Sequence, residues 1–509
     1  MNTFMNALQD ATNYTYTENG AVTHTTTNSD LLDMFAMGAA MRGRSNEDVI
    51  FMFKKAYTEN PEYALKCLFY IRDILEGQGE RRFFRVCLHW LATVDKAAAR
   101  RMIKFVPEFG RWDDLYTFVD TPVEEDALAF IRHQLVLDVN STTPSLLAKW
   151  MKSENTSSSE SKRLARITRH YLKMTSRQYR KTLSILRKRI NVLERLMSAG
   201  EWDKIEFDKI PSRAGIIYRN AFARHDVERM KLATTDSVVS YEDFAKDKET
   251  KVNAKALYPY DVVLKARNCR RKGLEDTERL MVNKYWDNLT DYFKDKTFNG
   301  IAVVDTSGSM TGWDDNKVAP IDVAISLGLY CAEHNHGPFA NRYISFASRP
   351  QLINTNGVDF VDKVDRIYRT NLVDNTNIEA VFDLILATAL SQKVRPEDIP
   401  QNVIIISDME FDAARGVRSW YSYRHDDETP TETLMESIAN KWAHHGMIMP
   451  NLVFWNVDAR QDNIPMKVKN GITFVSGCSP TVFDMIMTGK TGYDLMMDKL
   501  NSKRYAEIK

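Results

Sequence analysis

Oxygen-bearing side chains recur at three places in the C-terminal half of this 509-residue chain. Asp305, Ser307 and Ser309 stand at alternate positions after an apolar run, and Thr376 and Asp408 lie further along, each beside another apolar run. A carboxylate with several hydroxyls is the kind of hard oxygen ligand set that Mg²⁺ prefers. If the three segments leave one edge of a sheet, these five residues form a site for Mg²⁺ or another divalent cation.

A single Asp-x-Ser-x-Ser segment more often makes only a turn and a helix cap. Three such segments in this order favour the metal site instead. Glu410 and Asp412 follow closely, and we interpret them as solvated loop acids. The chain has no phosphate-binding Gly-x-x-x-x-Gly-Lys-Ser/Thr motif and no nucleophile elbow, so we expect no catalytic residues and no enzyme. A metal-dependent nuclease or phosphatase would need carboxylates such as Asp305 and Asp408 on the metal, and the hydroxyl-rich loop favours binding over that chemistry.

A second kind of chemistry is concentrated between Lys162 and Arg195, where twelve Lys and Arg residues accompany one acidic residue, Glu194. The whole chain carries a net charge of only +1, so the rest of it is acidic. Apolar residues recur at three- and four-residue spacing over 164–174 and 183–197, which predicts two amphipathic helices, the second spanning about 177–197. The outward cations of this basic stripe are Arg166, Arg169, Lys173, Arg177, Arg180, Lys181, Arg187, Lys188 and Arg195.

Like charges three and four residues apart repel one another on a helix. The basic stripe therefore needs a counter-charge in its working state, which favours polyanion binding over a merely solvated face. A membrane surface is disfavoured, because the apolar faces have the pattern of core helices.

The elements that position these residues change along the chain. Residues 1–28 predict a hairpin around a two-residue Asn19-Gly20 type I′ turn. Residues 29–296 show helical periodicity, which predicts an all-α array of stacked helix pairs. Residues 297–509 alternate apolar strands with helices, which predicts an α/β domain with a mostly parallel sheet. The expected strands are 301–304, 342–346, 403–406, 451–455 and 472–475.

The composition, 44% hydrophobic and 27% charged, is that of an ordinary globular protein with several cores. Five cysteines without a Cys-x-x-Cys pair favour a reducing compartment and disfavour a thiolate zinc site. No apolar run approaches the roughly 18 residues that a bilayer requires. We therefore expect a cytoplasmic protein with no membrane partner.

Together, Asp305, Ser307, Ser309, Thr376 and Asp408 resemble the metal-ion-dependent adhesion site (MIDAS) of von Willebrand factor A domains. The resemblance implies that residues 297–509 form such a Rossmann-like domain. It implies that the first four residues hold Mg²⁺ directly or through water, and that Asp408 acts through water. It also implies that the ion can take a carboxylate from a partner protein.

The helical region resembles a further family. Residues 71–82, 110–115 and 147–151, followed by an A domain, are similar to the Ro autoantigen (TROVE) architecture, and more closely to uncharacterised Ro-like relatives of phages and eukaryotes. This implies HEAT-like helical repeats that close into a ring with the A domain and bind structured or misfolded non-coding RNA with single-stranded ends. Ring closure requires both ends of the array to contact the A domain, which places residues 1–28 near residues 297–509.

Two hypotheses of function follow. The leading one is a Ro-type ribonucleoprotein component that binds RNA through the basic stripe and carries a Mg²⁺ site. The alternative is a protein-interaction adaptor, in which the metal site captures an acidic partner residue and the stripe binds an acidic protein.

The charged residues of the Ro-like segments are interpreted as ion pairs that fix the angles between helices. They are Glu80, Arg81, Arg82, Arg111 and Asp113.

Overall fold

The computed structural model describes residues 8–9, 12–233, 238–269, 272–312, 318–346, 349–370, 375–413 and 432–509. These residues form a helical part followed by a six-stranded sheet with its own helices, which confirms the predicted fold class. They divide into two compact units. The first unit contains residues 1–67, 257–272 and 289–506, and the second contains 68–256, 273–288 and 507–509. Both ends of the predicted helical array thus belong to the unit that holds the sheet.

The large sheet has the strand order β5-β4-β3-β6-β7-β8. The five predicted strands are confirmed and run parallel: β3 (Gly300–Asp305), β4 (Arg342–Phe346), β6 (Asn402–Ser407), β7 (Asn451–Asn456) and β8 (Ile472–Ser476). Their apolar runs are buried, as expected of a parallel sheet covered by helices. The edge strand β5 (Gln351–Asn354) pairs antiparallel with β4 and is largely exposed, so it has no apolar run that would predict it.

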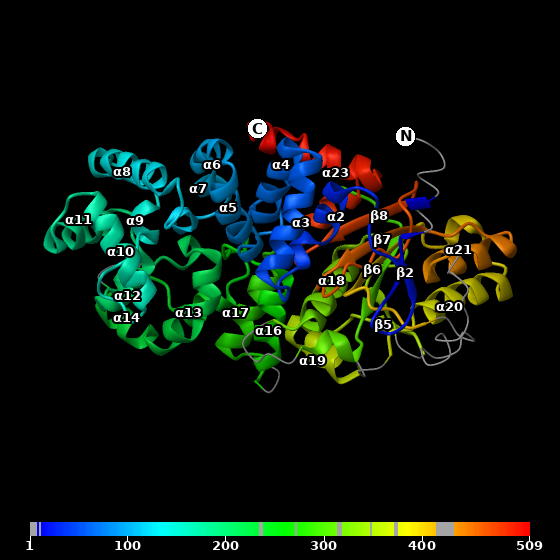
Figure 1. The fold of residues 1–509 in the computed structure, drawn as a ribbon. Coiled ribbons are helices and arrows are strands. Elements are labelled where there is room, and N and C mark those ends of the chain that lie inside the picture. The colour runs from blue at the N-terminus through cyan, green and yellow to red at the C-terminus, as the bar shows by residue number, and fades with distance from the viewer. Residues whose placement is uncertain are drawn as a thin grey trace. The chain divides into compact units, whose positions relative to one another are not determined.

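Helices flank this sheet (Figure 1): α18 (Pro320–His334), α19 (Phe360–Thr370), α20 (Ile378–Ser391), α21 (Leu434–His444), α22 (Thr481–Ile486) and α23 (Gly492–Leu500). Helix α18 packs on β3 and β4. At Gly328 of α18 an added Cβ would lie 2.4 Å from Cγ2 of Val304, so only glycine permits this approach. The close packing fixes β3, the strand that ends at Asp305.

Both ends of the helical array contact the α/β part, as predicted. Helix α2 (Asp30–Met37) has seven of its eight residues buried and packs on β8. Helix α16 (Pro259–Cys269) packs on α18 and α19. Residues 12–28 lie there too, because His24 and Ile464 exchange two backbone hydrogen bonds of 3.0 and 2.8 Å.

Every regular element described between residues 30 and 299 is helical. In the second unit these include α5 (Arg82–Val94), α8 (Glu124–Asn140), α10 (Ser159–Tyr171), α11 (Ser176–Arg189), α12 (Leu193–Ser198), α13 (Ser212–Arg224) and α17 (Thr277–Asp287). Aromatic rings fill part of its core. Phe69 meets Phe84 and Phe109 edge to face, with ring centroids 5.2 and 5.3 Å apart. Such pairs stabilise a core beyond their buried area.

The single helix predicted over 177–197 is wrong, because the chain breaks after Arg189. Asn191 adopts a left-handed conformation with φ 47°, and a new helix, α12, begins at Leu193. Asparagine tolerates this region better than most residues. Leu193 and Leu196 are buried on this new helix.

The predicted N-terminal hairpin is present, but its turn differs. Strands β1 (Tyr14–Tyr16) and β2 (Val22–His24) pair antiparallel, with Tyr16 opposite Val22. Five residues connect them instead of two. Gly20 has φ 87°, whereas Asn19 is not left-handed, so the turn is not type I′, which needs positive φ at both positions.

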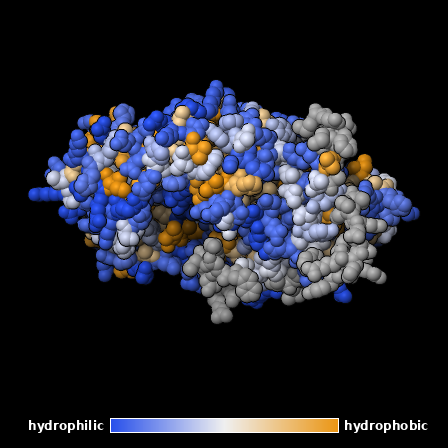
Figure 2. All heavy atoms as spheres, viewed as in Figure 1, coloured by the Kyte–Doolittle hydropathy of each residue, from blue (hydrophilic) through white to orange (hydrophobic). Residues whose placement is uncertain are grey.

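Within the described ranges, no helix is long and apolar enough to cross a membrane. Hydrophilic residues dominate the face drawn in Figure 2, where apolar residues form separate patches. All five cysteines are free thiols and buried.

Candidate functional sites

Four of the five predicted metal ligands gather at the carboxyl ends of neighbouring strands in the first unit, and the fifth, Thr376, lies beside the loop that follows β6, where its carbonyl binds the amide of Asp412. Asp305 ends β3, and Asp408 follows β6, which pairs with β3 in parallel register. Ser307 follows β3, Ser309 lies in the short 3₁₀ helix Gly308–Thr311, and Thr376 lies just before α20. Ligands converge at such strand ends in α/β sheets.

Hydrogen bonds hold the first of these side chains in place. Oδ1 of Asp305 accepts the amide of Ser307 at 2.9 Å, and Oδ2 accepts the Ser407 hydroxyl at 2.5 Å. The hydroxyls of Ser307 and Ser309 lie 3.0 Å apart, and Ser309 also hydrogen bonds to Asp408. Sequence reasoning missed Ser407, although its position at the end of β6, beside Asp305, was a usable signal.

The site carries uncompensated negative charge. Asp305 is fully buried, and burial together with the charge of Asp408 raises its pKa to about 7. Burial also raises the pKa of Asp408, whereas the nearby guanidinium of Arg460 lowers it. Nη2 of Arg460 lies 3.0 Å from Oδ2 of Asp408. Two carboxylates are thus buried close together, and the guanidinium of Arg460 binds only Asp408 of the two, an imbalance that a divalent cation would relieve.

The donor set fits a hard cation. It consists of carboxylate and hydroxyl oxygens only, the donors that Mg²⁺ prefers. Nowhere in the described part of the chain do three or more His, Cys, Asp or Glu residues form a metal-binding group. A cation at this edge would therefore depend on the hydroxyls of Ser307, Ser309 and Thr376 as well as on the carboxylates.

Interpreting Glu410 as a solvated loop acid is wrong. Its side chain is fully buried, and burial raises its pKa to about 7. Oε2 accepts the amide of Glu18 at 2.7 Å, and Oε1 accepts Nδ2 of Asn463 at 2.8 Å. Asp412, half-buried, donates its amide to the carbonyl of Thr376 at 3.0 Å. The sequence could not show that the N-terminal hairpin would cover this loop.

The tip of that hairpin reaches the site. Nδ2 of Asn19 donates to the carbonyl of Glu410 at 2.6 Å and lies 3.4 Å from Oγ1 of Thr376. The hydroxyl of Thr17 donates to the carbonyl of Phe411 at 2.6 Å. The Asn19 side chain therefore contacts the loop after β6 instead of serving only the turn.

The basic stripe lies on α10, α11, α12 and their connections in the second unit. Helix α11 turns Tyr179, Leu183 and Leu186 inward, each at most 3% exposed. Five of the predicted cations are exposed, and their side chains make no hydrogen bond or ion pair with any residue that the structure describes: Arg166, Lys173, Arg177, Lys181 and Lys188. A sixth, Arg180, is exposed and donates to the carbonyl of Ser176 on its own helix.

Three other members of the stripe are half-buried, and their predicted outward orientation is wrong. Arg169 pairs with Glu154 at 2.8 Å, and Arg195 pairs with Glu201 at 3.0 Å. Arg187 donates to the carbonyls of Ala148 and Met151 at 2.8 and 2.9 Å. These three guanidinium groups join segments of the fold and are not free for a ligand.

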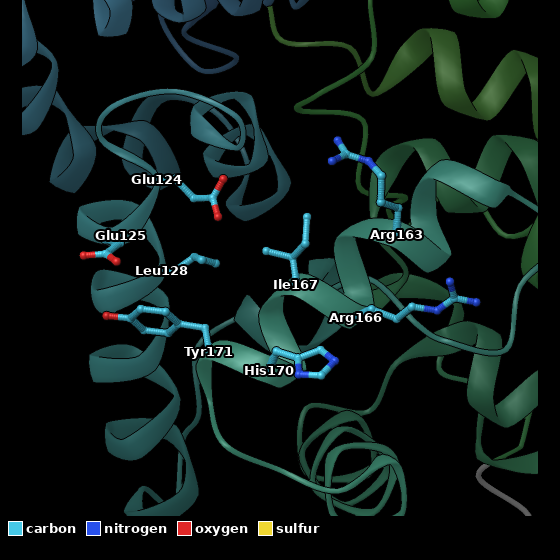
Figure 3. Close-up of a pocket in the computed structure, with 8 residues that line it drawn as sticks. All are labelled: Glu124, Glu125, Leu128, Arg163, Arg166, Ile167, His170 and Tyr171. Carbon is cyan, nitrogen blue, oxygen red and sulfur yellow. The ribbon is translucent and has the colours of Figure 1, made fainter.

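A pocket of about 420 Å³ lies where the stripe begins, between α8 and α10 (Figure 3). Tyr171 points toward α8, whereas Arg163 and Arg166 extend away from Glu124 and Glu125. Arg163 is bound by Glu160 and Asp120. The pocket has an acidic wall on α8, with Glu124 and Glu125, and a basic wall on α10, with Arg163 and Arg166.

The interpretation of the Ro-like segments as ion-paired is confirmed for Arg111 and Asp113, whose side chains make two hydrogen bonds of 2.9 Å. The centre of this network is the fully buried pair Arg72 and Asp114, at 2.9 and 2.7 Å. At Arg81, burial and the neighbouring positive charges of Arg111, Arg85 and Arg72 lower the pKa of the guanidinium to about 10.

Two family models, one relative and one solved structure are similar to this chain. A family model described as a domain of unknown function (DUF2828) matches residues 17–130 and 133–298, and a second, also a domain of unknown function (DUF7788), matches residues 299–507. An uncharacterised protein of Acanthamoeba polyphaga mimivirus is 31% identical over 516 residues, covering 94% of this chain and 85% of that protein. The crystal structure of the Ro (RSR) protein of Deinococcus radiodurans is similar at 15% identity with a TM-score of 0.48, covering 91% of this chain and 100% of that one.

Proposed function

This chain belongs to the family of the domain of unknown function DUF2828, and we propose that it is a Ro-type RNA-binding protein. The family description specifies no activity, so the proposal is argued from the charged surfaces of the chain itself. It binds structured or misfolded non-coding RNA, including single-stranded ends, through the basic stripe. A divalent cation, Mg²⁺ or a similar ion, binds at Asp305, Ser307, Ser309 and Thr376 with Asp408 behind them.

One observation carries the RNA proposal: five exposed cations of the stripe have no counter-charge among the described residues. The fold neutralises Arg169 and Arg195 with acids and leaves these five free. Arg177 and Lys188 lie eleven residues apart on α11, which is about 16 Å along a helix. A row of this length suits the repeated charge of a nucleic-acid backbone, and such contacts position a strand without reading its bases.

The test removes three of the free cations in the variant R177A/K181A/K188A. If each meets a phosphate, the slope of log affinity against log salt should flatten by about 0.7 per contact for single strands, or roughly 2 in all. The measurement is fluorescence anisotropy with a short labelled RNA that has a single-stranded end, titrated across a salt series.

The matched control is K248A/K251A/K255A, which removes three exposed lysines from the same unit outside the stripe. It should keep the parent's slope. Equal slopes in the parent and the stripe variant would refute RNA binding by the stripe, and the adaptor hypothesis would then be preferred.

A further inference from the structure

One guanidinium group separates a carboxylate of the N-terminal hairpin from a carboxylate of the candidate metal site. Nη1 of Arg460 lies 2.8 Å from Oε2 of Glu18, and Nη2 lies 3.0 Å from Oδ2 of Asp408. Glu18 also receives a hydrogen bond from Gln461 at 3.3 Å. The carboxylate of Glu18 is therefore held at the rim of the site. The guanidinium of Arg460, which neutralises Asp408, lies between the two carboxylates.

The hairpin is anchored on both sides of its tip. Thr17 binds Phe411, and Thr23 donates its hydroxyl to the carbonyl of Ile464 at 2.9 Å. Thr17 and Thr23 are 5% and 2% exposed. A segment buried to this degree by specific hydrogen bonds is part of the packed unit. A side chain from another protein could approach Thr376 and Asp408 from this side only if the hairpin moved away.

We propose that the chain's own Glu18, rather than a second protein, supplies the carboxylate that completes the candidate metal site. The inference rests on the proposed metal site. Mg²⁺ takes six oxygen ligands, so Asp305 and the hydroxyls of Ser307, Ser309 and Thr376 leave room for another carboxylate. In the absence of the cation, Arg460 balances Glu18 and Asp408. A divalent cation attracts both carboxylates more strongly than a single positive charge does, and the Arg460 side chain lies between Glu18 and Asp408.

The first test is calorimetric titration of the full chain with MgCl₂. Glu18→Gln keeps the size and hydrogen-bonding capacity of the side chain but removes its charge, and it should weaken Mg²⁺ binding on the order of tenfold. The control is Asp462→Asn. Asp462 lies two residues from Arg460 and pairs with Arg44 at 2.9 Å, so its loss removes one charge from the same loop without touching the site. It should change the affinity less than about twofold.

The second test follows backbone hydrogen exchange of Glu18 and His24, whose amides bind Glu410 and Ile464. Added MgCl₂ should slow this exchange in the parent and not in Glu18→Gln. Equal Mg²⁺ affinities in the parent and Glu18→Gln, with binding lost in Asp305→Ala, would overturn the role of Glu18 and leave the metal site standing. Equal affinity in Asp305→Ala would overturn the metal site itself. Faster exchange on adding MgCl₂ would mean that the cation expels the hairpin, which also overturns the inference.

Discussion

Asp305 opposes folding at neutral pH unless a cation accompanies it. Burial raises its pKa in the folded chain to about 7, well above the ordinary value of an aspartate, so the folded state binds more protons than the unfolded state between these values. The free energy of unfolding must therefore decrease as the pH rises through this range. This is the reverse of the usual behaviour of a carboxylate that is stabilised in the folded state.

For Asp305→Asn we predict a folded protein that lacks this pH dependence. In EDTA, the melting temperature of the parent should fall more steeply between pH 5 and pH 8 than that of the variant. MgCl₂ at pH 8 should raise the melting temperature of the parent only. Asp398→Asn, at an exposed residue, should behave as the parent does. Identical responses of Asp305→Asn and the parent to MgCl₂ would exclude Asp305 as a ligand.

The buried pair of Arg72 and Asp114 should be costly to break. Both side chains are at most 2% exposed, and Asp114→Asn would leave the guanidinium without its counter-charge. We expect a loss of about 3–5 kcal/mol in the free energy of unfolding, measured by urea denaturation. Asp126→Asn removes the partner of the exposed Arg100 and should cost less than about 1 kcal/mol. Similar costs for the two variants would contradict the structural role of the buried pair.

At the scale of elements, the parts that sequence predicts well are those whose residue pattern reflects burial. Runs such as 301–304 become buried strands, and Asp305 follows from its place at a strand end. Contacts that depend on distant residues could not be predicted. The break at Asn191 depends on the packing of α12, and the orientation of Arg187 depends on carbonyls 36 and 39 residues away. The burial of Glu410 depends on the hairpin.

Helix α11 presents its cations only because its apolar face is packed. Leu186 is 1% exposed, whereas the adjacent Ile185 is 43% exposed. Leu186→Ala should therefore cost about 2–5 kcal/mol of unfolding free energy. Ile185→Ala should cost much less, since it leaves no cavity. Chemical denaturation of both variants provides the measurement, and equal costs would show that α11 is not anchored through this face.

At the scale of the whole molecule, the α/β part depends on segments from both ends of the helical array. Residues 297–509 alone would lack α2, which covers β8, and α16, which covers α18 and α19. Burial of one large apolar side chain contributes roughly 1.5–3 kcal/mol, and α2 alone buries Leu31, Met34 and Phe35. We predict that this fragment will not unfold cooperatively by calorimetry, and that adding a peptide of residues 12–67 will restore a transition. A fragment that melts at the parent's temperature without the peptide would contradict this dependence.

The hairpin also affects how the protein folds as the ribosome makes it. Asn19 and Thr23 leave the ribosome early, but their hydrogen-bond partners lie 391 and 441 residues later. At typical rates of synthesis this gap lasts about 20–90 s. Residues 68–256 can fold during that interval, whereas the first unit cannot close until the last part of the chain has been translated. Its short N-terminal strands therefore stay without their final partners for most of the synthesis, as α2 also does, and during that time they are exposed to chaperones, proteases and wrong pairing.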